Sequence, residues 1–113
     1  MPEHKPLVWL HGEVKSPPLS KEARIEAGFL LRQLQQGVTL AMPQSETMPE
    51  IGKRCHQLRI RDENLLWRMP YRIDADAIVI LVVFAKKGGQ TPQHVIDSCK
   101  ERLKQYDKTK EGR

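Results

Sequence analysis

In each of two short segments of the sequence, 57–61 and 65–73, the arginines lie an even number of positions apart. Successive side chains of a β-strand point to opposite faces, so residues of one parity line one face. The alternation predicts two strands with arginines on one face and large apolar side chains on the other. The arginines are Arg59, Arg61, Arg68 and Arg72, and the apolar set is Leu58, Ile60, Leu65, Trp67, Met69, Tyr71 and Ile73. Such a face can attract phosphate polymers or acidic partners.

The charge of the chain is consistent with this interpretation. The formal net charge is +5 and the pI is about 9.4. Residues 51–73 contain six arginines and lysines against two acidic residues, so most of the excess charge lies there. A second interpretation stays open, in which the arginines only solvate an exposed face and discourage aggregation at a sheet edge.

Length and composition predict one folded domain. With 113 residues the chain can form a single modest core, and we expect residues 1–113 to be one domain. Hydrophobic residues make up 39% of the chain and charged residues 29%, as in ordinary globular proteins. The longest apolar run, 77–85, is too short to span a bilayer, and residues 1–10 lack a signal-peptide pattern. We therefore expect a cytoplasmic protein with no membrane partner.

The cysteines and histidines do not suggest a metal site. Cys55 and Cys99 lack the spacing of a CxxC motif, and the four histidines form no recognisable ligand cluster. We predict no structural metal, no cofactor and no disulfide.

The first half of the chain is expected to form a strand, a helix and a loop. Residues 7–10 form a short apolar run that predicts a strand at a sheet edge. Apolar residues at helical spacing follow either of two capping serines, Ser16 and Ser20, and Gly37 is placed to end the helix. Prolines and small polar residues in 39–52 predict a loop or a single helical turn.

The second half is expected to form a three-stranded antiparallel meander and a closing helix. The run 77–85 is apolar at both parities, which predicts a central strand covered on both faces. A helix should begin near Thr91 and Pro92, and the tail 107–113 should fray. The predicted fold class is α+β, with about four strands, helices on one side of the sheet and arginines on the other.

Several phrases of the sequence together resemble the phage-derived branch of the RelE/HigB/ParE toxins. These phrases are GFLLRQLQQG, QLRI, WRMPYRI, LVVFAKK and TPQHVIDSCKERL, which follow one another in the family's order, and the resemblance as a whole extends from about residue 7 to residue 103. Two positions depart from the pattern. Gln57 stands where an acidic residue is usual, and Pro70 interrupts the second arginine-bearing strand, where we expect a bulge or a sheet edge because proline lacks an amide hydrogen.

The resemblance implies a RelE-like fold and a type II toxin that cleaves messenger RNA without a metal ion, usually on the ribosome. In such cleavage the ribose 2′-hydroxyl attacks the adjacent phosphorus, so the protein must supply positive charge and assist proton transfer. Arginine forks match phosphate oxygens in pairs. The implied catalytic residues are Arg68, Lys86 and Arg59, and the implied RNA- or phosphate-binding residues are Arg61, Arg72, Lys87, Lys53 and Arg54.

The acid and base of this reaction are not assigned by the sequence. His56 and Tyr71 have suitable chemistry, but their parity puts them on the apolar side of the predicted strands, where packing is the simpler role. A lysine or arginine, Lys86 or Arg68, is the alternative.

The resemblance also implies partners and leaves other functions open. A toxin of this kind is paired with a cognate antitoxin, often of helix-turn-helix type, besides mRNA and the ribosome. One alternative is a ParE-like protein that inhibits DNA gyrase without catalysis. Another is a prophage-derived binding module that has kept the fold and lost toxicity.

Overall fold

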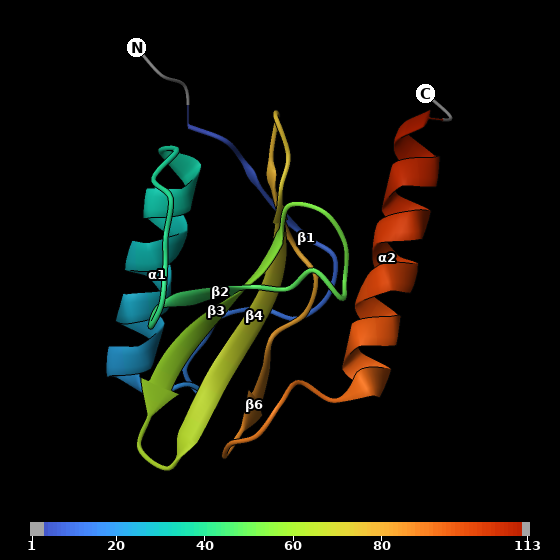
Figure 1. Ribbon diagram of the computed structural model, residues 1–113. Helices are drawn as coiled ribbons and strands as arrows, with labels where there is room; N and C mark the ends of the chain where they lie inside the picture. Colours follow the sequence, from blue (N-terminus) through green and yellow to red (C-terminus); the bar gives the residue numbers. More distant parts are fainter. Residues whose placement is uncertain (1–3, 112–113) are drawn as a thin grey trace.

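The computed structural model describes residues 4–111, and in this part of the chain six strands and two helices form a mixed α+β fold (Figure 1). The strands are β1 (Leu7–Trp9), β2 (Ser45–Thr47), β3 (Cys55–Asp62), β4 (Leu65–Ile73), β5 (Ile78–Ile80) and β6 (Phe84–Lys86). The helices are α1 (Lys21–Gln35) and α2 (Gln93–Glu111). The predicted fold class is confirmed, but the sheet is larger than the expected four strands.

The six strands form one sheet in the order β1-β5-β4-β3-β2, with β6 also paired to β4. Strands β3, β4 and β5 make the predicted antiparallel meander. Strand β1 lies at an edge as predicted, but it runs parallel to β5, so the sheet is mixed. Strand β2, antiparallel to β3, lies where a loop or turn was expected. That expectation was wrong because β2 has only three residues, too few to show an alternating pattern between the flanking prolines.

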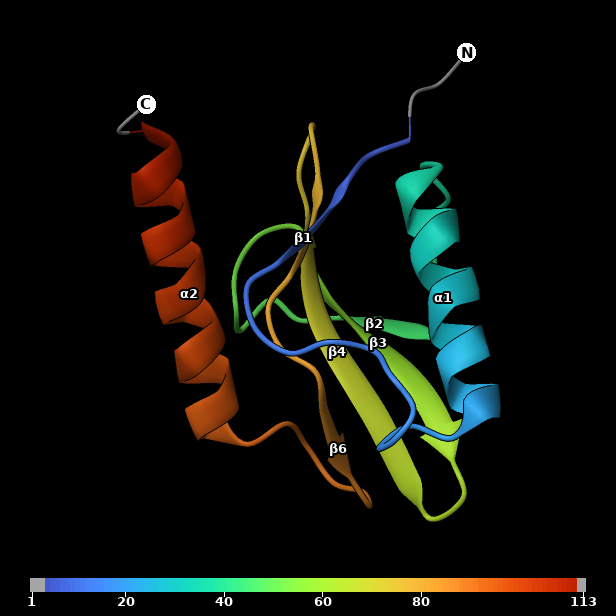
Figure 2. The same cartoon turned by 180° about the vertical axis from the view of Figure 1, so that it is seen from behind.

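The two helices cover opposite faces of the sheet, which corrects the prediction that both cover one side (Figures 1 and 2). Helix α1 packs on Leu58, Ile60, Met69 and Tyr71 through its buried residues Ala23, Ala27, Leu30, Leu31 and Leu34. Helix α2 packs on Met48, Val79 and Leu81 through Ile96, Cys99 and Leu103. The apolar residues of both parities in β5 need cover on both faces, and two helices provide it.

The start of α1 is fixed by side-chain hydrogen bonds. Ser20 is the N-cap, and its hydroxyl accepts a hydrogen bond from the Ala23 amide at 3.0 Å. Asp62, at the end of β3, accepts hydrogen bonds from the Ser20 amide and the Trp67 indole. The hydrogen bonds from Ser20, assisted by that from Trp67, lower the pKa of the Asp62 carboxyl. The helix therefore begins where its first turn joins the sheet.

We expect Ser20→Ala to lower the free energy of unfolding by about 1 kcal/mol, because an amide of the first turn loses its acceptor. Urea denaturation measures the change. Ser16, the other serine that the sequence offered as a cap, lies outside the helix and is exposed. Ser16→Ala is the matched control and should change the stability by less than about 0.5 kcal/mol. Equal losses for the two variants would contradict the assignment of the cap.

The central strand is β4 rather than the run 77–85. That run is divided into β5 and β6, and both pair with β4, at Tyr71–Ile73 and at Leu66–Arg68. Pro70 lies between these two pairings. Its register with β3 is unbroken, and its carbonyl accepts a hydrogen bond from the Leu81 amide in the interruption between β5 and β6. An amide hydrogen at position 70 would point toward that interruption, so its absence costs the sheet no hydrogen bond. Pro70 therefore needs neither the expected bulge nor an edge position, and each face of β4 keeps the same residues along the whole strand.

The C-terminal segment is more ordered than expected. Residues 107–111 belong to α2, and Asp107 and Lys110 form ion pairs with residues of the sheet and its turn. Residues 112–113 of the predicted frayed tail lie outside the described residues.

Candidate phosphate-binding site

Basic side chains gather on one face of the sheet, as the parity of the sequence predicts for the arginines of β3 and β4. Arg59 of β3 is paired in register with Arg68 of β4, and Arg61 is paired with Leu66. Leu66 is also paired with Lys86 of β6, so Lys86 joins the same face. Helix α2 covers the other end of this face. Arg61 at the uncovered end is therefore exposed and Arg59 is half-buried, whereas Arg68 is buried.

A cleft of about 550 Å³ opens beside Arg59 and Arg68. Its walls come from β2, the paired strands β3 and β4, and the segment 89–91 that leads into α2. Among the residues that line it are Glu46, Glu50, Arg59, Arg68, Thr91 and Gln93. The cleft thus contains carboxylates as well as guanidinium groups, a combination that allows both proton transfer and anion binding.

Arg68 is the most deeply buried cation of the cleft, with only 3% of its surface exposed. Its Nη2 donates a hydrogen bond of 2.8 Å to the Gly89 carbonyl, while its Nε is buried without a hydrogen-bond partner. Within residues 4–111, no carboxylate forms an ion pair with it. Burial and the nearby charge of Arg59 lower the pKa of the Arg68 guanidinium, against the opposing effect of Glu46. An arginine nevertheless stays charged at neutral pH.

The segment 89–91 is held by three strands of the sheet. Arg68 donates to the Gly89 carbonyl, and the Lys86 ammonium donates to the Gln90 carbonyl at 3.1 Å. Gly89 has φ +77°, which a residue with a side chain rarely adopts. The Thr91 hydroxyl donates to the Gln57 amide oxygen at 2.9 Å. These bonds bring Arg68 and Lys86 to the same segment at the rim of the cleft.

Glu46 is a candidate site residue that sequence reasoning missed. It lies on β2 directly opposite Gln57 of β3, and its Oε1 accepts a hydrogen bond of 2.8 Å from the Gln57 Nε2. Its other oxygen, Oε2, is 4.0 Å from the Arg59 Nη1. No sequence pattern marks this position, because β2 was expected to be a loop and only its pairing with β3 places Glu46 beside the arginines.

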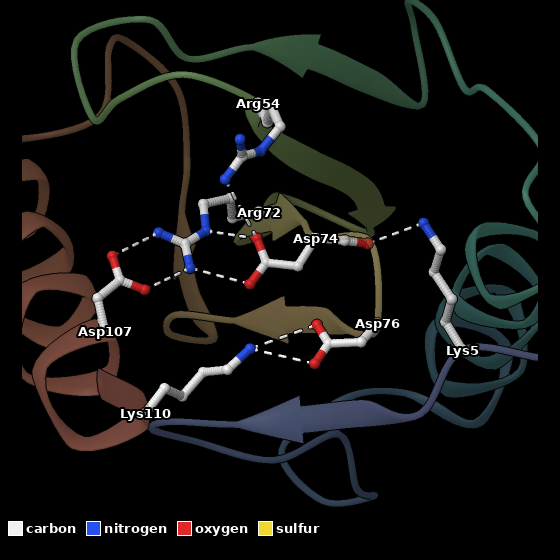
Figure 3. A network of polar contacts seen from close by, with 7 residues as sticks. All are labelled: Lys5, Arg54, Arg72, Asp74, Asp76, Asp107 and Lys110. Atoms are coloured by element: carbon white, nitrogen blue, oxygen red, sulfur yellow. Dashed lines mark hydrogen bonds and ion pairs between the residues drawn. The ribbon is translucent and has the colours of Figure 1, made fainter. Parts of the chain in front are cut away.

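Arg72 lies on the same face of β4 as Arg68. Unlike Arg68, it belongs to a network of ion pairs with carboxylates, which Figure 3 shows. Its guanidinium donates to both carboxylate oxygens of Asp74, at 2.7 and 2.9 Å, and to both of Asp107 on α2, at 3.0 and 2.7 Å. The hydrogen bonds to Asp107 and Asp74 raise the pKa of Arg72. This pairing joins α2 to the sheet and keeps Arg72 out of the cleft, so the structure does not bring the implied phosphate-binding Arg72 together with Arg68.

A family model described as "Phage derived protein Gp49-like (DUF891)" matches residues 18–104. The chain belongs to this Gp49-like family. The family is associated with RelE/HigB-type toxins. The matched range contains the cleft, the basic face and the first half of α2. A search of the curated proteins and a search of the solved structures found no match.

The remaining basic residues that the resemblance implied lie outside the cleft of this Gp49-like protein. Arg61 is exposed and lines a neighbouring hollow, which it shares with Arg59. Lys53 and Arg54 lie in the turn before β3, where Arg54 is 3.6 Å from Asp74. Lys87 is exposed just after β6. These side chains can extend a basic surface, but they do not converge with Arg68.

The two candidate acid/base residues lie on the α1 face of the Gp49-like sheet, opposite the arginines. Tyr71 is buried, and its hydroxyl shares a hydrogen bond of 2.8 Å with the Ser45 hydroxyl. The His56 ring stacks on the Tyr71 ring with centroids 5.4 Å apart. Burial raises the pKa of Tyr71 and lowers the pKa of His56. Their placement matches the parity argument and gives both residues a packing role.

Residues 4–111 of the Gp49-like chain contain further groups that bear on metal binding and thiol reactivity. No group of three or more His, Cys, Asp and Glu side chains in this range is arranged to hold a metal ion. Cys55 and Cys99 are buried free thiols, and burial raises the pKa of both. Neither helix is long and apolar enough to pass through a membrane.

Proposed function

We propose that this Gp49-like protein is the toxin of a toxin-antitoxin pair and cleaves messenger RNA without a metal ion, most effectively on the ribosome. Two observations support the proposal. The family is associated with RelE/HigB-type toxins, and the cleft combines guanidinium groups with carboxylates, while the Lys86 ammonium binds the Gln90 carbonyl at its rim. Single-stranded RNA, in which the ribose 2′-hydroxyl lies next to a phosphate, is the substrate class that this set of groups suits.

The observation that carries the proposal is the contrast between Arg68 and Arg72. Both arginines are buried on the same face of β4. Arg72 has two carboxylates as partners, whereas Arg68 has a single carbonyl oxygen and a buried Nε with none. A buried charge is costly unless an opposite charge pairs with it. A phosphate that enters the cleft would supply that charge to Arg68, and a guanidinium binds phosphate oxygens through two parallel hydrogen bonds.

The groups of the cleft can be assigned to the steps of RNA cleavage. Glu46 takes the proton of the 2′-hydroxyl, and the 2′-oxygen forms a bond to phosphorus while the bond from phosphorus to the 5′-oxygen breaks. Arg59 and Arg68 stabilise the negative charge that gathers on the phosphate oxygens. Lys86 gives a proton to the leaving 5′-oxygen. The products are a 2′,3′-cyclic phosphate and a 5′-hydroxyl end, which need no metal ion and no added water.

Glu46→Gln should reduce the rate of RNA cleavage by about 10²-fold, because the amide cannot accept the 2′-hydroxyl proton. The measurement is cleavage of a single-stranded RNA, alone and on translating ribosomes, by the purified chain in buffer with EDTA. The products should carry 2′,3′-cyclic phosphate and 5′-hydroxyl ends.

Glu101, an exposed residue of α2 away from the cleft, offers the matched control, since Glu101→Gln makes the same chemical change. That variant should cleave like the wild type. Intact RNA under all these conditions, or cleavage that EDTA abolishes, would reject a metal-independent nuclease. Blocked supercoiling by DNA gyrase with intact message would favour the ParE-like alternative.

We further propose that a cognate antitoxin inhibits the protein by covering the same cleft. Arg59 lines the cleft and is only half-buried, and the half-buried Lys86 binds the Gln90 carbonyl at the cleft rim. An acidic segment of the antitoxin could pair with these cations and exclude RNA. Arg59→Glu should therefore weaken both antitoxin binding and RNA cleavage. Unchanged affinity, measured by calorimetry, would place the antitoxin on another surface.

A further inference from the structure

A chain of three polar side chains runs behind the wall of the cleft. Gln57 of β3 is completely buried. Its Nε2 donates to the Glu46 Oε1 at 2.8 Å, and its Oε1 accepts from the Thr91 hydroxyl at 2.9 Å. Glu46 and Thr91 line the cleft, whereas Gln57 has no access to it. Gln57 therefore cannot touch RNA and can act only through its neighbours.

The two partners of Gln57 fix the orientation of its amide. An ionised carboxylate only accepts hydrogen bonds, so the NH₂ group of Gln57 must face Glu46 and the amide oxygen must face Thr91. The Thr91 hydroxyl can donate to that oxygen and thereby favours the same orientation.

This orientation determines which oxygen of Glu46 faces the reaction. The hydrogen bond from Gln57 engages Oε1 and holds the carboxylate in place across the strand pair. Oε2 remains on the side of Arg59, 4.0 Å from its Nη1. A base held in this way keeps its position while substrate binds, and catalytic rates depend strongly on such placement.

We propose that Gln57, oriented by Thr91, is a positioning residue that holds the Glu46 carboxylate for abstraction of the 2′-hydroxyl proton. The inference rests on the proposed function, because it assigns a role within that reaction. It also gives the segment 89–91 a second task besides holding Arg68 and Lys86, since Thr91 belongs to it. The competing interpretation is that the three side chains only satisfy each other's buried polar groups.

Gln57→Glu separates the two interpretations, because glutamate has nearly the same shape but presents an acceptor to Glu46 in place of a donor. Two adjacent carboxylates then share one proton. The acid limb of the pH profile of kcat/KM should move by about one to two pH units to higher pH. A purely structural role predicts a lower rate at every pH with the limb at its wild-type position.

Thr91→Val tests the same chain without adding a charge. Loss of the hydroxyl leaves the Gln57 amide free to turn, and kcat should fall by about tenfold. Affinity for an RNA with a 2′-deoxyribose at the cleavage position, which cannot react, should stay at the wild-type value. Thr91→Ser keeps the hydroxyl and should restore kcat.

The outcomes distinguish failure of this inference from failure of the proposed function. Wild-type protein that cleaves no RNA overturns both. Wild-type cleavage with a Gln57→Glu profile that superimposes on the wild-type profile overturns the positioning role alone. A Thr91→Val variant with wild-type kcat overturns the part assigned to Thr91.

Discussion

Arg68→Ala is expected to reduce RNA cleavage by about 10³-fold, the upper end of the range for loss of one preorganised donor to a developing anion. Arg68 lines the cleft, and within residues 4–111 no carboxylate forms an ion pair with it, so a phosphate that enters the cleft would supply the missing negative charge. The rate constant of cleavage under single-turnover conditions measures the effect directly. Arg68→Lys retains the charge but loses the planar fork, so an intermediate loss of about tenfold to 10²-fold is expected.

The stability of Arg68→Ala provides the control for this prediction. The guanidinium makes one hydrogen bond, to the Gly89 carbonyl, and it lies near the like charge of Arg59. Its removal should change the free energy of unfolding by no more than about 1 kcal/mol. A fully folded Arg68→Ala variant with wild-type cleavage would contradict the assignment of Arg68. A loss of activity that follows a large loss of stability would indicate a structural residue instead.

Arg72→Met should have the opposite pattern, with a loss of about 3 kcal/mol in the free energy of unfolding. Without the guanidinium, the buried carboxylate of Asp74 has lost its closest charged partner and α2 has lost its ion pair to the sheet. Urea denaturation measures the loss. Below the temperature at which the variant unfolds, cleavage per folded molecule should be within about twofold of the wild type, because Arg72 has no access to the cleft.

The pH dependence of stability should reveal the same ion pair. Arg72 is the main cause of the lowered pKa of Asp107. A carboxyl with a lower pKa in the folded state contributes stability above the unfolded value, near 3.8, and loses it as the pH falls through the folded value. The stability difference between the wild type and Arg72→Met should therefore shrink below pH 3.8. A difference that stays constant down to pH 2 would contradict this account of the pair.

The alternation in the sequence predicted the basic face because β3 and β4 pair in an unbroken register. Arg59 and Arg68 are direct partners, and two strands with intact alternation keep the same residues on the same side. The capping serine and Gly37 could be predicted for a similar reason, since helix ends depend on local chemistry. Predictions that rest on neighbours in the sequence were the reliable ones for this chain.

Features that depend on distant partners could not be predicted in this way. The sequence treats Arg68 and Arg72 as equivalent, but Asp107, 35 residues after Arg72, neutralises one and not the other. Glu46 becomes a site residue only through pairing between β2 and β3. Helix α2 covers the arginine-bearing face at one end, and no periodicity within α2 specifies which face of the sheet it will meet. Long-range packing decides each of these outcomes.

Mapping of RNA ends in bacteria that produce this chain without any antitoxin tests the central claim most directly. Primer extension on abundant messages should reveal discrete new 5′ ends within minutes of induction of the wild type. These ends should be absent after induction of Arg68→Ala at the same protein level and present after induction of Glu101→Gln. Messages that stay intact while the wild type accumulates, or new ends that are equally strong with Arg68→Ala, would contradict the assignment of an RNA-cleaving cleft around Arg68.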